Sequence, residues 1–136
     1  MMKEKQTVTS FLESESKILI LLRSEHVSTY QGRWGGISGS VDEDKTPDEQ
    51  ALLEIKEETC LSGKDIELVR KGESLLIDDK ELDVQKVVHP YLFHVENPSK
   101  IRIDWEHQQI KWIKPEEIDD YETMPELKET LAKVLR

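Results

Sequence analysis

The sequence predicts an α/β domain in which helices and strands pack as a sandwich. Residues 17–23 contain an almost continuous Ile/Leu run, which is typical of a strand buried on both faces. A capped helix begins near residue 46, and strand patterns lie on both sides of it along the chain. A further helix is expected near the C-terminal end. This order favours layers of helix and sheet, and its length assigns residues 1–136 to one domain.

The segment before the central helix contains two predicted strands, residues 7–13 and 17–23, joined by a polar turn at residues 14–16. The polar residues 24–34 are expected to form a loop. Glycines then cluster within a few positions, at Gly32, Gly35, Gly36 and Gly39. Because glycine lacks a Cβ atom, this density indicates turns and a close approach of the backbone to another group.

The central helix is predicted to run from Thr46 to about Cys60. Thr46 suits the N-cap, Pro47 suits the first turn, and Glu49 completes a capping box. Gly63 is expected to stop the helix. The apolar face is expected to comprise three residues: Ala51, Leu52 and Ile55.

The second half of the chain carries strand patterns over residues 66–77 and 81–95. Pro90 lies inside the second of these, which suggests an edge strand or a bulge. Residues 110–113 predict a further short strand, and residues 115–118 a helical turn. Residues 125–135 predict the terminal helix, whose apolar residues recur at helical spacing: Leu127, Leu131, Val134 and Leu135.

The net charge of −10 argues against tight, sequence-independent binding to nucleic acid or to an anionic membrane, because both require a basic face. Residues 42–58 hold eight acidic residues against two lysines, a local charge of −6. Such a segment would repel an anionic substrate unless a metal ion accompanied it.

The chain is expected to work in the cytoplasm. Its N-terminal residues are charged and are not followed by an apolar run, so no signal peptide is predicted. The longest apolar run, residues 18–22, is far too short to span a membrane. Cys60 is the only cysteine, which excludes an intrachain disulfide.

Three carboxylates of the central helix share one stripe. Glu54, Glu57 and Glu58 fall within about 100° of one another on a helical projection. Like charges at this spacing weaken a helix by a few tenths of a kcal/mol per pair, roughly, so a compensating group is expected. Oxygen ligands suit Mg²⁺, with Mn²⁺ as a possible substitute. The alternative is a solvated acidic helix face.

The glycine loop and the helix together contain the pattern Gly39-x5-Lys45-x7-Leu53-Glu54-Ile55-x-Glu57-Glu58-x-Cys60-Leu61. This pattern, at residues 39–61, resembles the signature of the Nudix (MutT-like) hydrolase family. The resemblance extends over nearly the whole chain. It implies the Nudix fold, a mixed β-sheet sandwiched between helices. It also implies hydrolysis of a pyrophosphate bond in a nucleoside diphosphate linked to another group, X.

The signature is degenerate at three positions. Lys45 stands where the family has Glu, Leu53 where it has Arg, and Cys60 where it has Gly. Loss of the Arg/Glu pair favours an alternative, a catalytically weak or inactive Nudix-fold domain that binds a nucleotide for regulation. Retention of the helix glutamates favours the enzyme. At Cys60 a left-handed conformation would cost roughly 1 kcal/mol, unless the helix continued toward Gly63.

The resemblance also implies residue roles. Glu57 and Glu58 would be primary Mg²⁺ ligands, Glu54 a ligand or the base that orients water, and the Gly39 carbonyl a further ligand. Glu106 precedes the strand at residues 110–113 and would be an additional ligand or the general base. A surface carboxylate is the alternative for Glu106.

Two arginines are candidates for holding substrate phosphates, Arg23 at a strand end and Arg33 in the following loop. Trp34 would stack on a base or fill the core. His107 is expected to face solvent. The resemblance is compatible with a homodimer, although no apolar stripe in the sequence demands one.

Overall fold

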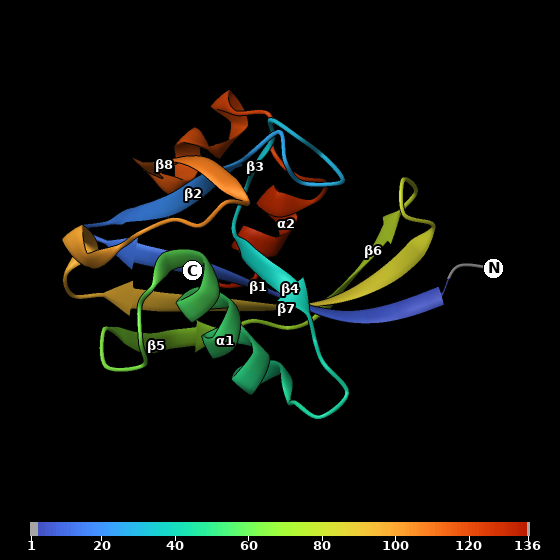
Figure 1. Cartoon of the computed structure of the whole chain (residues 1–136), viewed down its shortest axis with the longest axis horizontal. Helices are drawn as coiled ribbons and strands as arrows, with labels where there is room; N and C mark the ends of the chain where they lie inside the picture. The colour runs from blue at the N-terminus through green and yellow to red at the C-terminus, as the bar shows by residue number, and fades with distance from the viewer. Residues whose placement is uncertain (1–2, 136) are drawn as a thin grey trace.

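Two long parallel strands form the centre of the sheet in the computed structural model, which describes residues 3–135. They are β1 (Lys3–Ser14) and β7 (Val84–Val95), and they pair from Lys3 with Val84 to Glu13 with His94. Every other strand pair is antiparallel, so the eight-stranded sheet is mixed. The α/β sandwich with a mixed sheet is therefore confirmed (Figure 1).

The remaining strands flank this central pair. On one side, β2 (Lys17–Arg23) follows β1 through a tight turn, where Glu15 and Ser16 both have positive φ, as a two-residue hairpin requires. The short strand β3 (Trp34–Gly35) and β8 (His107–Ile113) pair with β2, and β4 (Ile37–Ser40) pairs with β1. On the other side, β5 (Ile66–Lys71) and β6 (Leu75–Asp79) pair with β7.

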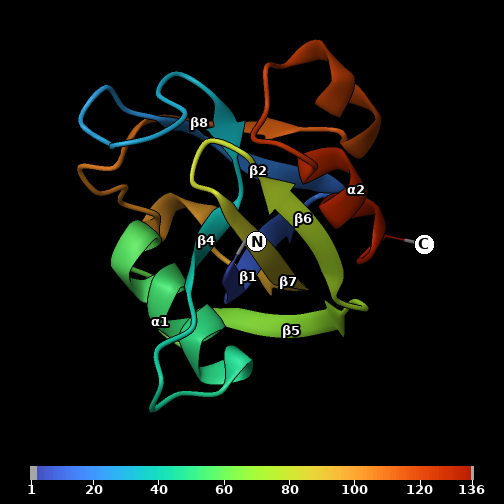
Figure 2. The ribbon, with the colours of Figure 1, turned by 90° about the vertical axis from the view of Figure 1, so that its right-hand side faces the viewer.

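The helices lie on opposite sides of the sheet. Figure 2 shows α1 (Pro47–Thr59) on one side of the central strands and α2 (Leu127–Ala132) on the other. Two 3₁₀ turns, η1 (Pro98–Lys100) and η2 (Pro115–Asp120), flank β8 along the chain. No helix in residues 3–135 is long and apolar enough to cross a membrane.

Each side of the sheet carries its own core, which explains the Ile/Leu run of β2. Leu19 and Leu21 pack with Ala51 and Ile55 of α1, whereas Ile18 and Ile20 pack on the α2 side. Because side chains of a strand alternate between faces, a strand with helices on both sides must be apolar throughout. All four β2 residues are at most 1% exposed, so the predicted two-sided burial is confirmed.

Several predicted boundaries differ from the structure. The helix ends at Thr59 because Cys60 takes the left-handed conformation (φ 65°), so Gly63 does not stop it. Leu52, assigned to the apolar face, is 45% exposed. Residues 66–77 hold β5 and most of β6, which continues to Asp79, and α2 is shorter than residues 125–135.

Pro90 lies in a central strand, so of its two expected settings the edge strand was wrong. The nearest register shift lies in β5, between Leu68 and Arg70, which pair with Phe93 and Leu92 of β7. The position of Pro90 nevertheless has a physical reason. β6 pairs with β7 up to Val88, and β5 pairs with β7 from Tyr91 onward, so Pro90 falls between two partner strands. There the missing N–H of proline interrupts neither antiparallel ladder.

Candidate active site

The helix α1 holds its carboxylates against the sheet because its N-terminus is fixed locally. Thr46 accepts a hydrogen bond from the Glu49 backbone N–H, and the Glu49 side chain accepts from the Thr46 N–H. This confirms the predicted capping box. Ala51 and Ile55, both fully buried, pack on the sheet. The remaining helix faces are fixed by this contact, and they carry Glu54 and Glu58 along the edge of the core.

Glu54 lies directly against Gly39 of β4. A Cβ atom on Gly39 would be only 2.6 and 2.7 Å from the two Glu54 oxygens, closer than such contacts ever occur. The close approach predicted from the glycine cluster is therefore an approach to a carboxylate. Gln50, one turn earlier, donates to Glu54 Oε2 at 2.6 Å and accepts from the Asp42 backbone N–H at 3.1 Å. Gln50 is itself 2% exposed, so it fixes Glu54 from inside.

Glu58 is the most deeply buried acid of the helix, at 3% exposure. No described residue donates a hydrogen bond to its Oε2. Burial raises the pKa of Glu58 well above its ordinary value, and the neighbouring charges of Glu54, Glu106 and Asp104 raise it further. Burial also raises the pKa of Glu54, and the nearby Glu57 adds to this effect. Two adjacent carboxylates, one of them with a buried oxygen that accepts no hydrogen bond, favour a bound cation.

Glu57 differs from Glu54 and Glu58 in being exposed to solvent. The helical projection groups all three glutamates, but Glu57 lies on the exposed edge of the stripe whereas Glu58 lies inside. Within residues 3–135, no three His, Cys, Asp or Glu side chains converge on one point as a ready-made metal cluster. The structure therefore brings Glu54 and Glu58 together with Gly39 and leaves Glu57 at the solvent boundary.

The loop before β8 brings Glu106 to the same place. Ser24 fixes this loop, because its hydroxyl donates to the Trp105 carbonyl at 2.9 Å and its backbone N–H donates to the Glu106 carbonyl at 2.8 Å. The pKa of Glu106 is raised by burial first and then by Asp104 and Glu54, whereas Arg23 lowers it. Glu106 thus lies within electrostatic reach of the helix carboxylates and of Arg23.

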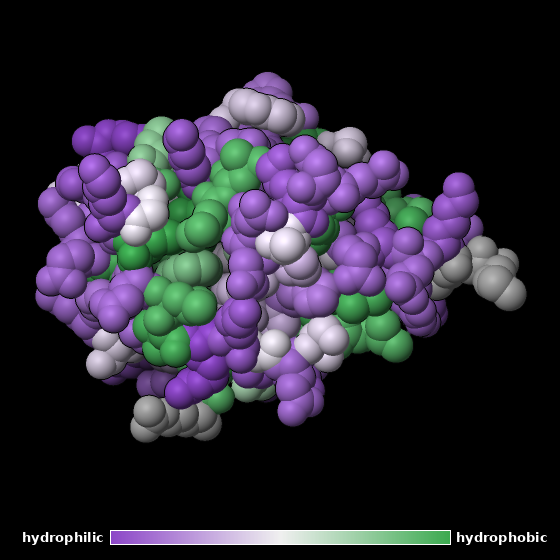
Figure 3. Space-filling view, turned by 90° about the horizontal axis from the view of Figure 1, so that it is seen from below, coloured by the Kyte–Doolittle hydropathy of each residue, from purple (hydrophilic) through white to green (hydrophobic). Residues whose placement is uncertain are grey.

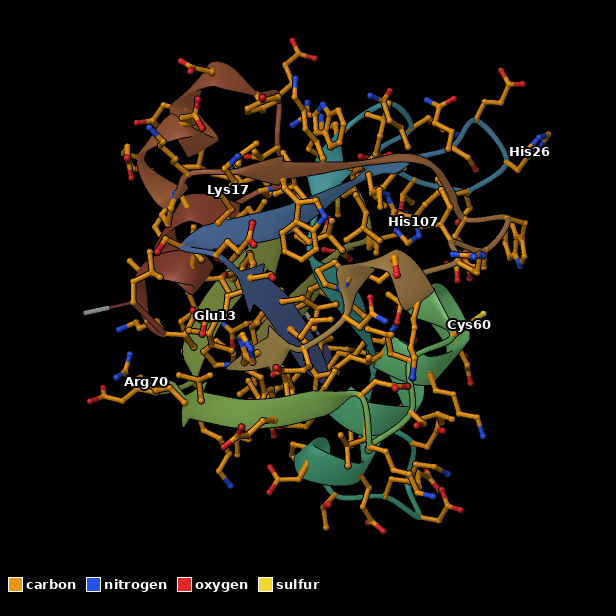
Figure 4. All side chains as sticks on the ribbon, turned by 90° about the vertical axis from the view of Figure 1, so that its left-hand side faces the viewer. Glu13, Lys17, His26, Cys60, Arg70 and His107 are labelled. Carbon is orange, nitrogen blue, oxygen red and sulfur yellow. The ribbon has the colours of Figure 1, made fainter. Side chains whose placement is uncertain are left out.

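His107 does not face solvent, contrary to expectation. It is 7% exposed, and Figure 4 shows it beneath β8, on the side of the molecule where α1 ends at Cys60. Its Nδ1 lies 3.2 Å from Asp104 Oδ1, and its Nε2 lies 3.7 Å from Glu58 Oε1. Burial lowers its pKa. The sequence did offer one signal, the spacing of three residues between Asp104 and His107.

The two candidate phosphate ligands occupy different surroundings. Arg23 Nε and Nη2 donate to the Thr29 carbonyl at 3.2 and 3.0 Å, which ties the loop at residues 24–33 to the end of β2. Arg33 Nη1 donates to the Thr123 carbonyl at 3.3 Å, and its guanidinium lies over the Tyr30 ring. Arg23 is also near enough to Glu106 to lower its pKa, whereas the contacts of Arg33 are with the loop and with the segment before α2.

Trp34 packs rather than standing free. Its ring meets Tyr121 edge to face, with centroids 5.6 Å apart, and it lies against the core on the α2 side. Trp34 is partly buried and has the contacts expected of a core aromatic. Lys45, which replaces the signature Glu, pairs with Asp42 and Asp44 in the loop before α1.

A cavity of about 150 Å³ lies on the α2 side of β1 and β4. Thr7 and Thr9 line it, while the intervening Val8 points into the core under α1. Gly39 also lines it, so the same glycine borders both the cavity and Glu54. At the far wall Lys86 pairs with the buried Asp79 at 3.0 Å.

The face of the molecule seen from below in the view of Figure 1 is mostly hydrophilic, with separate apolar patches (Figure 3). The large apolar side chains that remain exposed over the described residues come from several elements: Leu52, Leu68, Val69, Leu76, Leu82 and Trp105.

Comparison with known proteins supports one family. The NUDIX domain model matches residues 3–135. The chain is 26% identical over 124 residues to a CTP pyrophosphohydrolase of Escherichia coli K12, covering 91% of this chain and 86% of that relative. Among solved structures, a MutT protein from Methanosarcina mazei Go1 superposes with a TM-score of 0.81 at 20% identity, covering 96% of this chain and 92% of that one.

A second solved structure, a C. elegans Ap4A hydrolase binary complex, superposes with a TM-score of 0.74 at 21% identity, covering 96% of this chain and 93% of that one. These likenesses confirm the fold that the signature implied. Because the family model spans almost every residue, the chain belongs to the Nudix family and is a Nudix-type pyrophosphohydrolase.

Proposed function

We propose that this protein is a Mg²⁺-dependent hydrolase that cleaves the pyrophosphate bond of a nucleoside diphosphate linked to another group, X. The observation that carries the proposal is the carboxylate pair of Glu54 and Glu58. One lies against the backbone of Gly39, and the other is buried with an oxygen that accepts no hydrogen bond from any described residue. A hard divalent cation satisfies that oxygen and offsets the repulsion.

The donor set fits Mg²⁺, and Mn²⁺ as its substitute, because it consists of oxygen atoms alone. We assign the ligands to Glu54, Glu57, Glu58 and the Gly39 carbonyl. Glu57 is exposed and therefore free to turn toward a bound ion. When bound, the ion supplies charge neutralisation on the diphosphate and acidifies a water molecule.

Proton transfer is assigned to Glu106, with Glu54 as the other candidate base. The water oxygen bonds to one phosphorus, the bridging P–O bond breaks, and the leaving phosphate keeps the electron pair. The proton of the water passes to the carboxylate. The raised pKa of Glu106, caused by burial and by Asp104, makes it a stronger proton acceptor than an ordinary glutamate.

The anionic substrate needs cationic contacts of its own in a chain this acidic. Arg23 is proposed to hold a phosphate oxygen, since it lies beside Glu106 and its fork of donors matches phosphate. Arg33 is proposed to contact an outer phosphate. The cavity bordered by Gly39 is proposed to receive the nucleoside, because it adjoins the acidic site and carries both polar and apolar walls. The similarity to a CTP pyrophosphohydrolase and to an Ap4A hydrolase supports a nucleotide substrate.

A hydrolysis panel tests the proposal. It should contain nucleoside triphosphates, a sugar nucleotide, ADP-ribose and a dinucleoside polyphosphate, each with and without Mg²⁺. We expect Mg²⁺-dependent turnover of one class and its loss in Glu57→Gln. A matched control is Glu116→Gln, which removes an exposed carboxylate of η2 and should leave turnover unchanged. Turnover that persists in Glu57→Gln would contradict the assignment of that ligand.

The second candidate is a catalytically weak Nudix domain that binds a nucleotide for regulation. The observation that favours it is Lys45, which pairs with loop aspartates and leaves the signature Arg/Glu interaction absent, with Leu53 in the place of Arg. Saturable binding of one nucleotide without turnover across the panel would support this function over the hydrolase.

The proposed setting is the cytoplasm, with a small nucleotide-type substrate as partner and no stable nucleic-acid or membrane partner. A homodimer is the oligomeric state that the family resemblance suggests. Sedimentation equilibrium measures the state directly, and a monomer mass at all concentrations would exclude the dimer.

A further inference from the structure

His107 occupies a position that the proposed mechanism does not use. It begins β8, opposite Arg23 of β2, where the register of the two strands shifts. Its side chain is 4% exposed, which is rare for a histidine without partners. Two carboxylates face it, one on each nitrogen, and they come from different parts of the chain. The ring therefore bridges the loop before β8 and the helix α1.

The first contact fixes the ring. Nδ1 lies 3.2 Å from Asp104 Oδ1, and Asp104 Oδ1 also accepts the Glu106 backbone N–H at 3.3 Å. Asp104 is thereby held by the loop whose carbonyls are bound to Ser24. A carboxylate on Nδ1 sets the orientation of an imidazole and favours a proton on that nitrogen.

The second contact distinguishes the two oxygens of Glu58. Oε1 lies 3.7 Å from His107 Nε2, whereas Oε2 has no hydrogen-bond partner among the described residues. The terminal torsion of a glutamate is soft, so a buried carboxylate without a neighbour on either oxygen would turn over a wide range. Here the imidazole lies on the Oε1 side of the carboxylate, and Oε2 is buried without a hydrogen-bond partner among the described residues.

We propose that His107 is a positioning residue: held by Asp104, its ring orients the Glu58 carboxylate so that Oε2 points toward a bound divalent cation. This inference rests on the proposed Mg²⁺ site and deepens it. Groups that orient metal ligands in this way influence metal affinity strongly, although they do not touch the ion. His107 and Asp104 therefore govern how tightly the metal binds rather than how the nucleotide binds.

The test measures Mn²⁺ binding directly, by calorimetry or by the electron paramagnetic resonance of free Mn²⁺. We expect His107→Leu to weaken Mn²⁺ binding about tenfold or more. His107→Gln places a polar amide beside the Glu58 carboxylate in place of the ring and should restore most of the affinity. Asp104→Asn, a milder change at a partly exposed side chain, should weaken binding by a few-fold, roughly, because the ring loses its fixed orientation.

Activity gives a second readout, which a residue that only fills space would not change. His107→Leu should raise the Mg²⁺ concentration for half-maximal rate, while KM for the nucleotide at saturating Mg²⁺ stays unchanged. The matched control is His26→Leu, because His26 lies at the exposed end of the loop at residues 24–33 (Figure 4). That control should match wild type in both measurements.

Two outcomes overturn the proposal, and they differ. If His107→Leu and Asp104→Asn bind Mn²⁺ as tightly as wild type and differ from it only in a lower melting temperature, His107 is a packing residue and the metal site stands. If wild type itself binds no Mn²⁺, both the proposed metal site and the positioning role fail.

Discussion

Gly39 illustrates how one residue permits the whole acidic site. The Glu54 carboxylate lies against one side of its backbone, and the cavity proposed for the nucleoside lies on the other side. A residue with a Cβ would displace the Glu54 carboxylate, because that atom would lie well inside the contact distance of both Glu54 oxygens. The requirement is therefore steric, and it does not depend on a positive φ, which Gly39 lacks.

Gly39→Ala should move Glu54 away from the strand. We expect a loss of about 10²-fold in kcat/KM, since a displacement near 1 Å at a catalytic group has that effect. The unfolding free energy should fall by about 1–3 kcal/mol, as overpacked sites do. The checks are steady-state kinetics and urea denaturation. Gly63→Ala is the control, because its Cβ would meet nothing within 4 Å, and a similar loss there would contradict the steric account.

The residues of the site differ in how far sequence predicts them. The contact of Glu54 with Gly39 agrees with the close approach that the glycine cluster predicts, because one loop and one helix bring the two together. The roles of Glu54, Glu57, Glu58 and Gly39 as ligands stay predictions. His107 was misplaced, because its burial depends on β8 pairing with β2, which lies more than 80 residues earlier in the chain. Gln50 was also missed, although its spacing of four from Glu54 on one helix was a local signal.

At the scale of elements, α1 was predicted well at its start and poorly at its end. The capping box involves four consecutive residues and needs no tertiary contact, so the sequence suffices. The end depends on Cys60, which adopts φ 65° although it bears a Cβ. Its backbone N–H donates to the Lys56 carbonyl at 2.9 Å, which closes the last turn. The free-energy cost expected for a left-handed Cys60 therefore does not make the helix continue toward Gly63.

Cys60→Gly should therefore stabilise the protein. Glycine takes the left-handed conformation without the Cβ contact, so the unfolding free energy should rise by about 1 kcal/mol. Chemical denaturation measures the gain. Cys60→Ala keeps a Cβ and should give no such gain. A destabilised Cys60→Gly would mean that the thiol makes a contribution that outweighs the backbone cost.

The apolar pattern predicts where the strands lie along the chain but not which strands pair with one another. The pattern over residues 81–95 located β7, and its central position became clear only from the pairing with β1, β5 and β6. The expectation of an edge strand at Pro90 failed because the rule for proline assumes one continuous partner strand, whereas β7 changes partner at that residue. Strand order is a non-local property, which periodicity cannot supply.

At the scale of the whole molecule, burial on both faces of β2 predicted a sheet covered on two sides, and the structure has two cores. What sequence did not predict is how distant loops meet. The Tyr30 hydroxyl donates to the buried Asp79 at 2.8 Å, joining the loop at residues 24–33 to the end of β6. Neither residue has a local pattern that marks the other.

The fold as a whole confines acids that repel one another, and this has a consequence for stability. The pKa of Glu58 is raised well above its ordinary value of 4.5, first by burial. A carboxyl with a raised pKa in the folded state binds its proton more tightly there than in the unfolded chain. Its contribution is therefore present at low pH and is lost as pH rises from about 4.5 through the folded value. His107, whose pKa is lowered, acts in the opposite sense below its ordinary value of 6.5.

Comparison of wild type with Glu58→Gln isolates this effect, because Gln resembles the protonated acid and the other groups cancel. The most direct measurement of the central claim is the melting temperature of both proteins against pH, in chelator and then with Mg²⁺ at constant ionic strength. We predict that in chelator the variant becomes more stable than wild type as pH rises above 4.5, and that Mg²⁺ stabilises wild type but not the variant. Parallel pH curves in chelator, or an equal Mg²⁺ response in both proteins, would contradict a cation site built on Glu58.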